Sequence, residues 1–144
     1  MALVLVASDL SSLRHSVRAT LEGPDLEVIE AATGPDAVET AIDREVDLAI
    51  CDLQIAAMGG VAICSELRNQ ESFGNAPHVP ILMLLDRRPD VFLARRAGAE
   101  GFCVKPLEPS RLRRAVRAIL GGGTFEDDAW RPVTVGASGA SPHG

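Results

Sequence analysis

The chain has 144 residues, a length that fits one domain with a substantial buried core. Its net charge of -6 argues against nucleic-acid binding as the main task, because such binding needs a basic surface. No apolar stretch approaches the roughly 18 to 20 residues of a membrane span, and the short apolar start lacks the basic segment of a signal peptide. We therefore expect a soluble, cytoplasmic protein that contacts neither nucleic acid directly nor a membrane.

Short apolar runs alternate with helix-like patterns along the chain. The runs predict strands at residues 2–7, 26–31, 48–51, 81–85 and 101–104. Apolar residues at helical spacing predict helices at residues 10–22, 35–45, 60–70, 89–97 and 109–120. Because the first, third and fourth runs are apolar throughout, we expect strands that are buried on both faces, as in a parallel sheet. The alternation predicts an α/β fold of five successive βα units, (βα)5, with right-handed crossovers and helices on both faces of the sheet.

The composition changes after the last predicted helix. Residues 122–144 are rich in Gly, Ser, Ala and Pro and show little periodicity, which is typical of a mostly disordered tail. Phe125 and Trp130 are the side chains expected to attach the first part of this tail to the domain. The sequence thus predicts one domain at residues 1–121, followed by the tail.

Three charged residues stand where predicted strands end. Asp9 follows the first strand, Asp52 the third, and Lys105, the sole lysine among fourteen basic residues, the fifth. With the flavodoxin-like strand order 2-1-3-4-5, a three-layer sandwich, the three strand ends meet at one edge, where open α/β sheets bind ligands. Two carboxylates and a backbone carbonyl suit Mg²⁺, and an ammonium suits a phosphoryl oxygen. The alternative is structural, with Asp9 as a helix cap and Lys105 as an ion-pair partner, but three converging charges favour a phosphate and metal site.

A wider set of residues follows a fixed order along the chain: Asp9, Asp52, Met58 with Gly60, Gly98-Ala99-Glu100, Phe102, Lys105-Pro106 and the helix pattern of residues 109–120. In this order the chain resembles the receiver domain of bacterial two-component response regulators over about residues 2–120. The resemblance implies that Asp52 accepts a phosphoryl group and that Lys105 contacts it. It also implies that Asp9, Asp52 and the carbonyl of Gln54 bind Mg²⁺, and that Phe102 is the switch aromatic.

Three positions depart from the pattern of that family. Ser8 replaces one acid of the usual pair after the first strand, so the site loses a negative charge and should bind Mg²⁺ more weakly. Leu85 stands where the family has Ser or Thr, and it offers no hydroxyl for a phosphoryl oxygen, so the switch loses one contact. Asp86 replaces a small residue; pointing inward it would repel a phosphoryl donor, and pointing outward it would cap the next helix.

These departures leave two hypotheses for the function. The first is a receiver that accepts a phosphoryl group on Asp52 from a histidine kinase or phosphotransfer protein and signals by protein contact. The second is a pseudo-receiver, a binding module that works without phosphorylation. An enzyme is disfavoured: a phosphatase with an Asp nucleophile would need a second acid where Gln54 stands, and a flavin site would not place the carboxylate of Asp9 in its phosphate loop.

The predicted helix at residues 89–97, the strand at 101–104 and the helix at 109–120 share a basic character. Their arginines are Arg95, Arg96, Arg111, Arg113, Arg114 and Arg117. One interpretation is an ordinary solvated helix surface. The other is a docking face for an acidic downstream protein or for a second copy of the domain.

Overall fold

The computed structural model describes residues 1–127. Residues 128–144, the larger part of the predicted tail, lie outside the described residues. The strands are β1 (Ala2–Ala7), β2 (Leu26–Ala31), β3 (Leu48–Asp52), β4 (Ile81–Leu85), β5 (Gly101–Val104) and β6 (Phe125–Glu126). The helices are α1 (Ser11–Leu21), α2 (Gly34–Asp43), α3 (Gly60–Ser72), α4 (Val91–Ala97) and α5 (Pro109–Leu120), and the 3-10 turn η1 (Arg88–Asp90) precedes α4. Within the described part of the chain, no helix is both long and apolar enough to span a bilayer.

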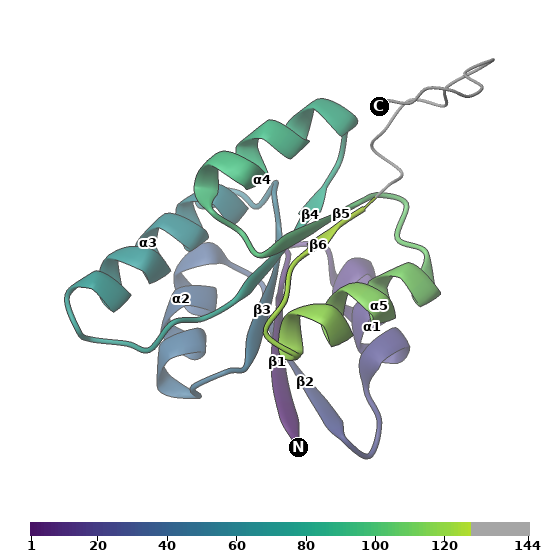
Figure 1. Ribbon diagram of the computed structural model, residues 1–144, viewed down its shortest axis with the longest axis horizontal. Helices are drawn as coiled ribbons and strands as arrows, with labels where there is room; N and C mark the ends of the chain where they lie inside the picture. The colour runs from purple at the N-terminus through teal and green to yellow at the C-terminus, as the bar shows by residue number, and fades with distance from the viewer. Residues whose placement is uncertain (128–144) are drawn as a thin grey trace.

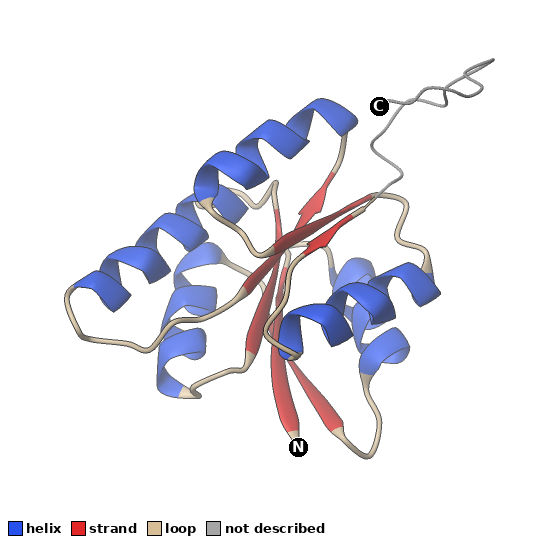
Figure 2. Ribbon diagram, in the orientation of Figure 1, coloured by secondary structure: helices blue, strands red, loops and turns tan. Residues whose placement is uncertain are grey.

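The strands form one sheet in the order β2-β1-β3-β4-β5-β6, and every neighbouring pair is parallel. Helices α2, α3 and α4 cover one face, and α1 and α5 cover the other (Figure 1). Figure 2 shows the sheet in red between these two helical layers. The predicted α/β fold with the order 2-1-3-4-5 is confirmed, and β6 is added beside β5.

The core lies on both faces of the sheet, because successive side chains of a strand point to opposite sides. On β1, Leu5 and Ala7 belong to the apolar cluster beneath α2, α3 and α4, whereas Val4 and Val6 belong to the cluster beneath α1 and α5. Strands β3 and β4 are buried along their full length, which explains why their sequences are apolar without alternation. The carboxyl ends of these central strands are therefore fixed by packing from both sides.

Capping side chains determine where two helices begin. The hydroxyl of Thr33 accepts a hydrogen bond from the N–H of Asp36 at 3.2 Å, directly before α2. The carboxylate of Glu108 accepts one from the N–H of Arg111 at 2.8 Å, directly before α5. Each helix also carries a proline in its first turn, where the missing N–H has no intrahelical partner to lose.

Strand β6 differs from the expectation of a tail that begins at residue 122. The N–H of Phe125 donates to the carbonyl of Glu100 at 3.1 Å, and its ring packs against the core beneath α5. A Cβ at position 101 would lie 2.7 Å from the carbonyl oxygen of Phe125, so the glycine there permits the close approach of the two strands. Attachment through Phe125 agrees with the expectation, whereas Trp130 lies outside the described residues.

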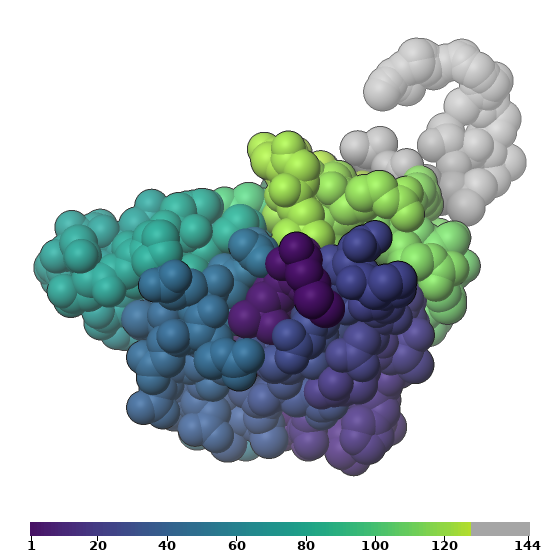
Figure 3. Space-filling view, turned by 90° about the horizontal axis from the view of Figure 1, so that it is seen from below, coloured from purple at the N-terminus to yellow at the C-terminus, as the bar shows by residue number. Residues whose placement is uncertain are grey.

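Figure 3 shows the molecule from below, with the purple N-terminal residues near the middle of the view. An ionic cluster ties α3 to the starts of β4 and β5. The imidazole of His78 contacts Glu71 through Nδ1 at 2.9 Å and Glu100 through Nε2 at 2.6 Å. Glu100 in turn accepts from Arg68 at 2.9 Å and from the N–H of Ile81 at 2.8 Å. Burial lowers the pKa of His78, but the hydrogen bonds with both glutamates raise it more, so the net shift is upward.

This geometry predicts a pH-dependent contribution to stability. An imidazole donates to two carboxylates only when both nitrogens are protonated, so the folded state favours the charged form. The stabilisation is complete below the unfolded pKa of about 6.5 and is lost as the pH rises through the higher folded pKa. In urea unfolding at pH values from about 5.5 to 9, the difference in the free energy of unfolding between the parent and His78→Gln should shrink with rising pH.

His15→Gln provides the matched control, because His15 lies on α1 outside this cluster. Its pH profile is the reference against which that of His78→Gln is compared. Identical pH profiles for the two histidine variants would show that His78 does not act as the charged link.

Candidate functional site

Asp52 is the last residue of β3, and its side chain is only 1% exposed. Both carboxylate oxygens accept hydrogen bonds. Oδ1 accepts from the Nζ of Lys105 at 2.8 Å, and Oδ2 accepts from the hydroxyl of Ser8 at 2.9 Å. The hydroxyl of Ser8 also accepts from the N–H of Leu10 at 3.1 Å, which fixes its direction at the start of α1. The buried negative charge is thus held by one cation and one hydroxyl from the ends of two other strands.

Lys105 follows β5 and connects two carboxylates. Its Nζ lies 2.8 Å from Asp52 and 2.9 Å from Oδ1 of Asp86, and its N–H donates to the carbonyl of Leu85 at 2.8 Å. Burial lowers the pKa of the ammonium, but the hydrogen bonds with Asp52 and Asp86 raise it more, so it lies above its usual value. Lys105 therefore stays charged at neutral pH.

Asp9 and Gln54 lie at the same edge, on the solvent side. Asp9 is exposed, and its Oδ2 accepts from the N–H of Ala56 at 3.1 Å, which brings it against the loop that carries Gln54. Within residues 1–127, no group of three or more His, Cys, Asp or Glu side chains is placed to bind a metal ion. The donors expected for Mg²⁺ are all oxygens and fit that ion in kind, with two carboxylates, one carbonyl and water as ligands.

Glycines shape the loop between β3 and α3. A Cβ on Gly59 would collide with the carbonyl oxygen of Leu53, and the N–H of Gly60 donates to that same oxygen at 3.2 Å. The loop therefore turns back tightly over the end of β3. This close approach brings the N–H of Ala56 to the carboxylate of Asp9 and explains the glycines after Met58 in physical terms.

The structure also places the departures from the family pattern. Leu85 is fully buried at the end of β4, in the cluster beneath α4. Asp86 points toward the site and pairs with Lys105. Among the described residues, no side-chain hydrogen bond caps the start of α4; the carboxylate of Asp90 instead accepts from the N–H of Arg87 at 3.1 Å, at the start of η1. Phe102 lies in the same apolar cluster and is 2% exposed.

Two contacts of the site were not predicted from the sequence. Ser8 bonds Asp52 directly, whereas the sequence indicated only that it removes a negative charge from the metal site. Asp86 forms the second partner of Lys105. The sequence indicated that both residues lie at this edge, since Ser8 follows β1 and Asp86 follows β4. It did not indicate where their side chains point, because side-chain direction at a strand end is set by the neighbouring loops.

These features define a parallel α/β domain with a lysine and several carboxylates gathered at the carboxyl ends of its strands. The chain belongs to the response regulator receiver domain family, which it matches over residues 4–117. Receiver domains act in two-component signal transduction, and they generally bind Mg²⁺ at their acidic site.

Several curated proteins are similar to this chain. It is 31% identical to the alkaline phosphatase synthesis transcriptional regulatory protein PhoP of Bacillus subtilis (strain 168) over 119 residues. The matched region covers 81% of this chain and 48% of PhoP. It is 28% identical to the nitrate/nitrite response regulator protein NarL of Escherichia coli (strain K12), over 92% of this chain and 61% of NarL. The chain therefore spans about half to three fifths of these regulators. A response regulatory protein of Mycobacterium tuberculosis (strain H37Rv) is 33% identical and is covered over 90% of its length.

Solved structures support the same assignment. The chemotaxis response regulator CheY4 of Vibrio cholerae matches with a TM-score of 0.72 and 31% identity, over 81% of this chain and 97% of CheY4. A LuxR-family two-component response regulator from Aurantimonas sp. SI85-9A1 matches with a TM-score of 0.76 and 25% identity, over 87% of this chain and 89% of that one.

The site geometry predicts unequal costs for removing its charged partners. Lys105→Ala should lower the free energy of unfolding by on the order of 1 to 3 kcal/mol, because it leaves the buried Asp52 with only Ser8 as a partner. Asp86→Ala should cost less than about 1 kcal/mol, since it removes only the more exposed pair. Urea unfolding at neutral pH measures both.

The double variant Lys105→Ala/Asp52→Asn is the control for this prediction. Removing the buried charge together with its partner should restore most of the stability lost in Lys105→Ala, giving a clear coupling energy in the double-mutant cycle. Strict additivity of the two changes would mean that Lys105 does not compensate the charge of Asp52.

Proposed function

We propose that this chain accepts a phosphoryl group on Asp52 from a histidine kinase or a phosphotransfer protein and passes the signal on by protein contact. The observation that carries the proposal is the contact between Asp52 and Lys105 at the carboxyl end of the sheet. A carboxylate serves as a nucleophile toward phosphorus, and a nearby ammonium offsets the charge of the phosphoryl oxygens.

The proposed step joins one oxygen of Asp52 to phosphorus and breaks the bond between phosphorus and the nitrogen of a donor phosphohistidine. The departing imidazole takes up a proton. A bound Mg²⁺, held by Asp9, Asp52 and the carbonyl of Gln54, would neutralise part of the phosphoryl charge. The chain itself contributes position and electrostatics, since the strand ends hold the nucleophile and the ammonium in place.

Lys105 and Asp86 have linked roles in this proposal. Each oxygen of Asp52 accepts one hydrogen bond in the present structure and keeps a second lone pair for attack on phosphorus. The flexible stem of Lys105 lets its ammonium leave Oδ1 for a phosphoryl oxygen while it remains paired with Asp86. Asp86 then acts as a tether for the cation, at the cost of added negative charge beside the incoming group.

A second candidate function is a pseudo-receiver that binds partners without phosphorylation. Two observations favour it. Asp52 is only 1% exposed, and Leu85 is fully buried and has no hydroxyl to bond a phosphoryl oxygen. In either case we propose a cytoplasmic protein that contacts other proteins through α4, β5 and α5, with a downstream protein or a second copy as the partner, and that binds neither DNA nor a membrane itself.

Incubation with acetyl phosphate and Mg²⁺ should add one phosphoryl group to the intact protein, as measured by mass spectrometry. Asp52→Asn should abolish the gain, because it replaces the nucleophilic oxygen pair. Asp36→Asn should retain it and serves as the matched control, since it changes an exposed carboxylate in the first turn of α2, outside the site. A parent protein that gains no mass, under conditions in which a known receiver is modified, would refute phosphorylation and leave the pseudo-receiver.

A magnesium titration followed by NMR tests the proposed metal ligands. Amide signals of Asp9, Asp52 and Gln54 should shift at millimolar Mg²⁺, and Asp9→Asn should weaken this response by about ten-fold or more, because one of two charged ligands is lost. Asp36→Asn, an exposed acid in the first turn of α2, is the control and should leave the titration unchanged. Shifts that are equal in both variants would exclude Asp9 as a ligand.

A further inference from the structure

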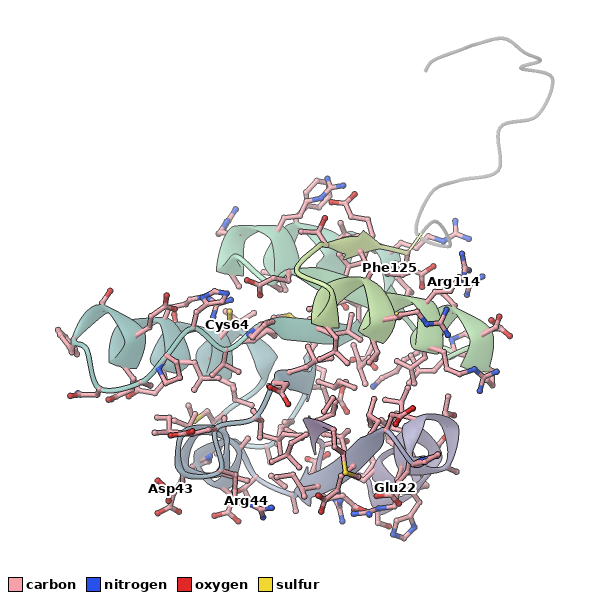
Figure 4. The ribbon with its side chains drawn as sticks, turned by 60° about the horizontal axis from the view of Figure 1, so that its bottom comes forward. Glu22, Asp43, Arg44, Cys64, Arg114 and Phe125 are labelled. Atoms are coloured by element: carbon pink, nitrogen blue, oxygen red, sulfur yellow. The ribbon has the colours of Figure 1, made fainter. Side chains whose placement is uncertain are left out.

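The segment that follows α5 returns to the sheet and covers the edge of β5. We call residues 124–127 the strap. Its strand β6 pairs with β5 in parallel, with Phe125 opposite Gly101 and Glu126 opposite Phe102. Figure 4 labels Phe125 on this strand, beside the ribbon of α5. An edge strand presents backbone groups to any extended chain, so the strap occupies a surface that is otherwise open to strand addition.

The last residue of the strap makes the strongest contact. Asp127 is fully buried, and its Oδ2 accepts from the N–H of Val104 at 2.9 Å, while its Oδ1 lies 3.1 Å from Nε of Arg111 on α5. Burial raises the pKa of the Cys103 thiol to about 12, and the charge of Asp127 adds to this shift. The hydrogen bond from Val104 means that the carboxylate of Asp127 satisfies the last backbone N–H of β5, one residue before Lys105.

The remaining contacts of the strap are weaker. Glu126 pairs with Arg95 of α4 at 2.7 Å, but both side chains are 42% exposed, and exposed pairs of this kind contribute little. The strand itself is two residues long. The strap is joined to α5 by three glycines, Gly121 to Gly123, of which Gly122 has a φ of 93°. Glycine adopts many backbone conformations, so this joint allows the strap to leave without disturbing α5.

We propose that the strap is a releasable internal ligand of the β5 edge, and that an extended acidic segment of a protein partner displaces it when that partner docks between α4 and α5. The inference rests on the proposed use of this face for protein contact. The strap itself shows the chemistry of the partner. An apolar residue packs beside α5, and two successive carboxylates meet Arg95 and Arg111. Two of the six arginines of the predicted basic face are thus paired within the chain until a partner replaces these acids.

The first test measures hydrogen–deuterium exchange in the full-length protein. Asp127→Ala should speed exchange at the amide of Val104 by about ten-fold or more, with Asp127→Asn intermediate because it keeps an acceptor. The amides of Val4 and Val6 in the centre of the sheet should keep the rate of the parent. Asp43→Asn, at the end of α2, is the control and should change neither. Unchanged exchange at Val104, or an equal rise at Val4 and Val6, overturns the proposal, because the strap would then be inert or an integral part of the fold.

The second test uses an acetylated peptide with the sequence Gly-Thr-Phe-Glu-Asp, which copies residues 123–127. It should bind the Asp127→Ala protein at least about ten-fold more tightly than the parent and should slow exchange at Val104 again. The neutral peptide Gly-Thr-Phe-Gln-Asn should bind much more weakly to both proteins. Equal binding of the acidic and neutral peptides, or equal binding to both proteins, would contradict the proposal.

Two further measurements keep the test decisive. If Asp127→Ala does not fold, Asp127→Asn weakens the strap by removing its buried charge while keeping an acceptor, and it should raise peptide binding above that of the parent; no rise counts against release. A parent protein that is a dimer by light scattering, and that loses the dimer in Glu126→Gln, would assign the β5 edge to the strap of a second copy instead. None of these experiments needs a phosphoryl donor or Mg²⁺, so their failure is distinct from a failure of phosphorylation on Asp52.

Discussion

The contact between Asp52 and Lys105 is the constraint on which the rest of the site depends. A carboxylate that is 1% exposed is costly to bury unless a cation and hydrogen-bond donors offset the loss of water. Here the donors come from opposite sides of β3: Ser8 follows the neighbouring strand β1, and Lys105 follows β5, which lies beyond β4. Because β3 and β4 are apolar and packed on both faces, this charge can be satisfied only at the strand ends. The ligand edge is therefore also the place where the fold balances its buried charge.

The distribution of acids around Lys105 differs from the one that the family pattern implies. That pattern has two acids after β1, whereas this chain has Ser8 and Asp9 there and carries a further acid, Asp86, after β4. The number of carboxylates at the edge is thus the same as in the family pattern, but one of them stands after β4, next to the lysine, instead of after β1. The shift takes negative charge from the expected metal ligands and gives it to the cation, which favours a firmly held ammonium over a strongly bound Mg²⁺.

Periodicity predicted five strands of a parallel sheet, and the strand-end charges, combined with the flavodoxin-like strand order, predicted the meeting of Asp52 with Lys105. They were sufficient because parallel strands bring their carboxyl ends to one edge whatever the details of packing. Strand β6 was not predictable in this way, since two residues show no period. The direction of Asp86 was left open as well, because a residue just beyond a strand takes its direction from the following turn, here set by Asp90 and η1. The role of Asp127 depends on Arg111 of a separate helix, and no local pattern connects the two.

The long separations along the chain within the site have a consequence for folding. The bonds of Asp52 to Ser8 and to Lys105 join residues 44 and 53 positions apart, so Ser8 is in place only once β1 has paired with β3, and Lys105 only once β5 has joined the sheet. A partly folded chain that buries Asp52 without them bears an uncompensated charge, which raises its free energy relative to both the unfolded and the native state. The same carboxylate that we propose as the phosphoryl acceptor thus disfavours half-formed sheets and makes folding more nearly all-or-none.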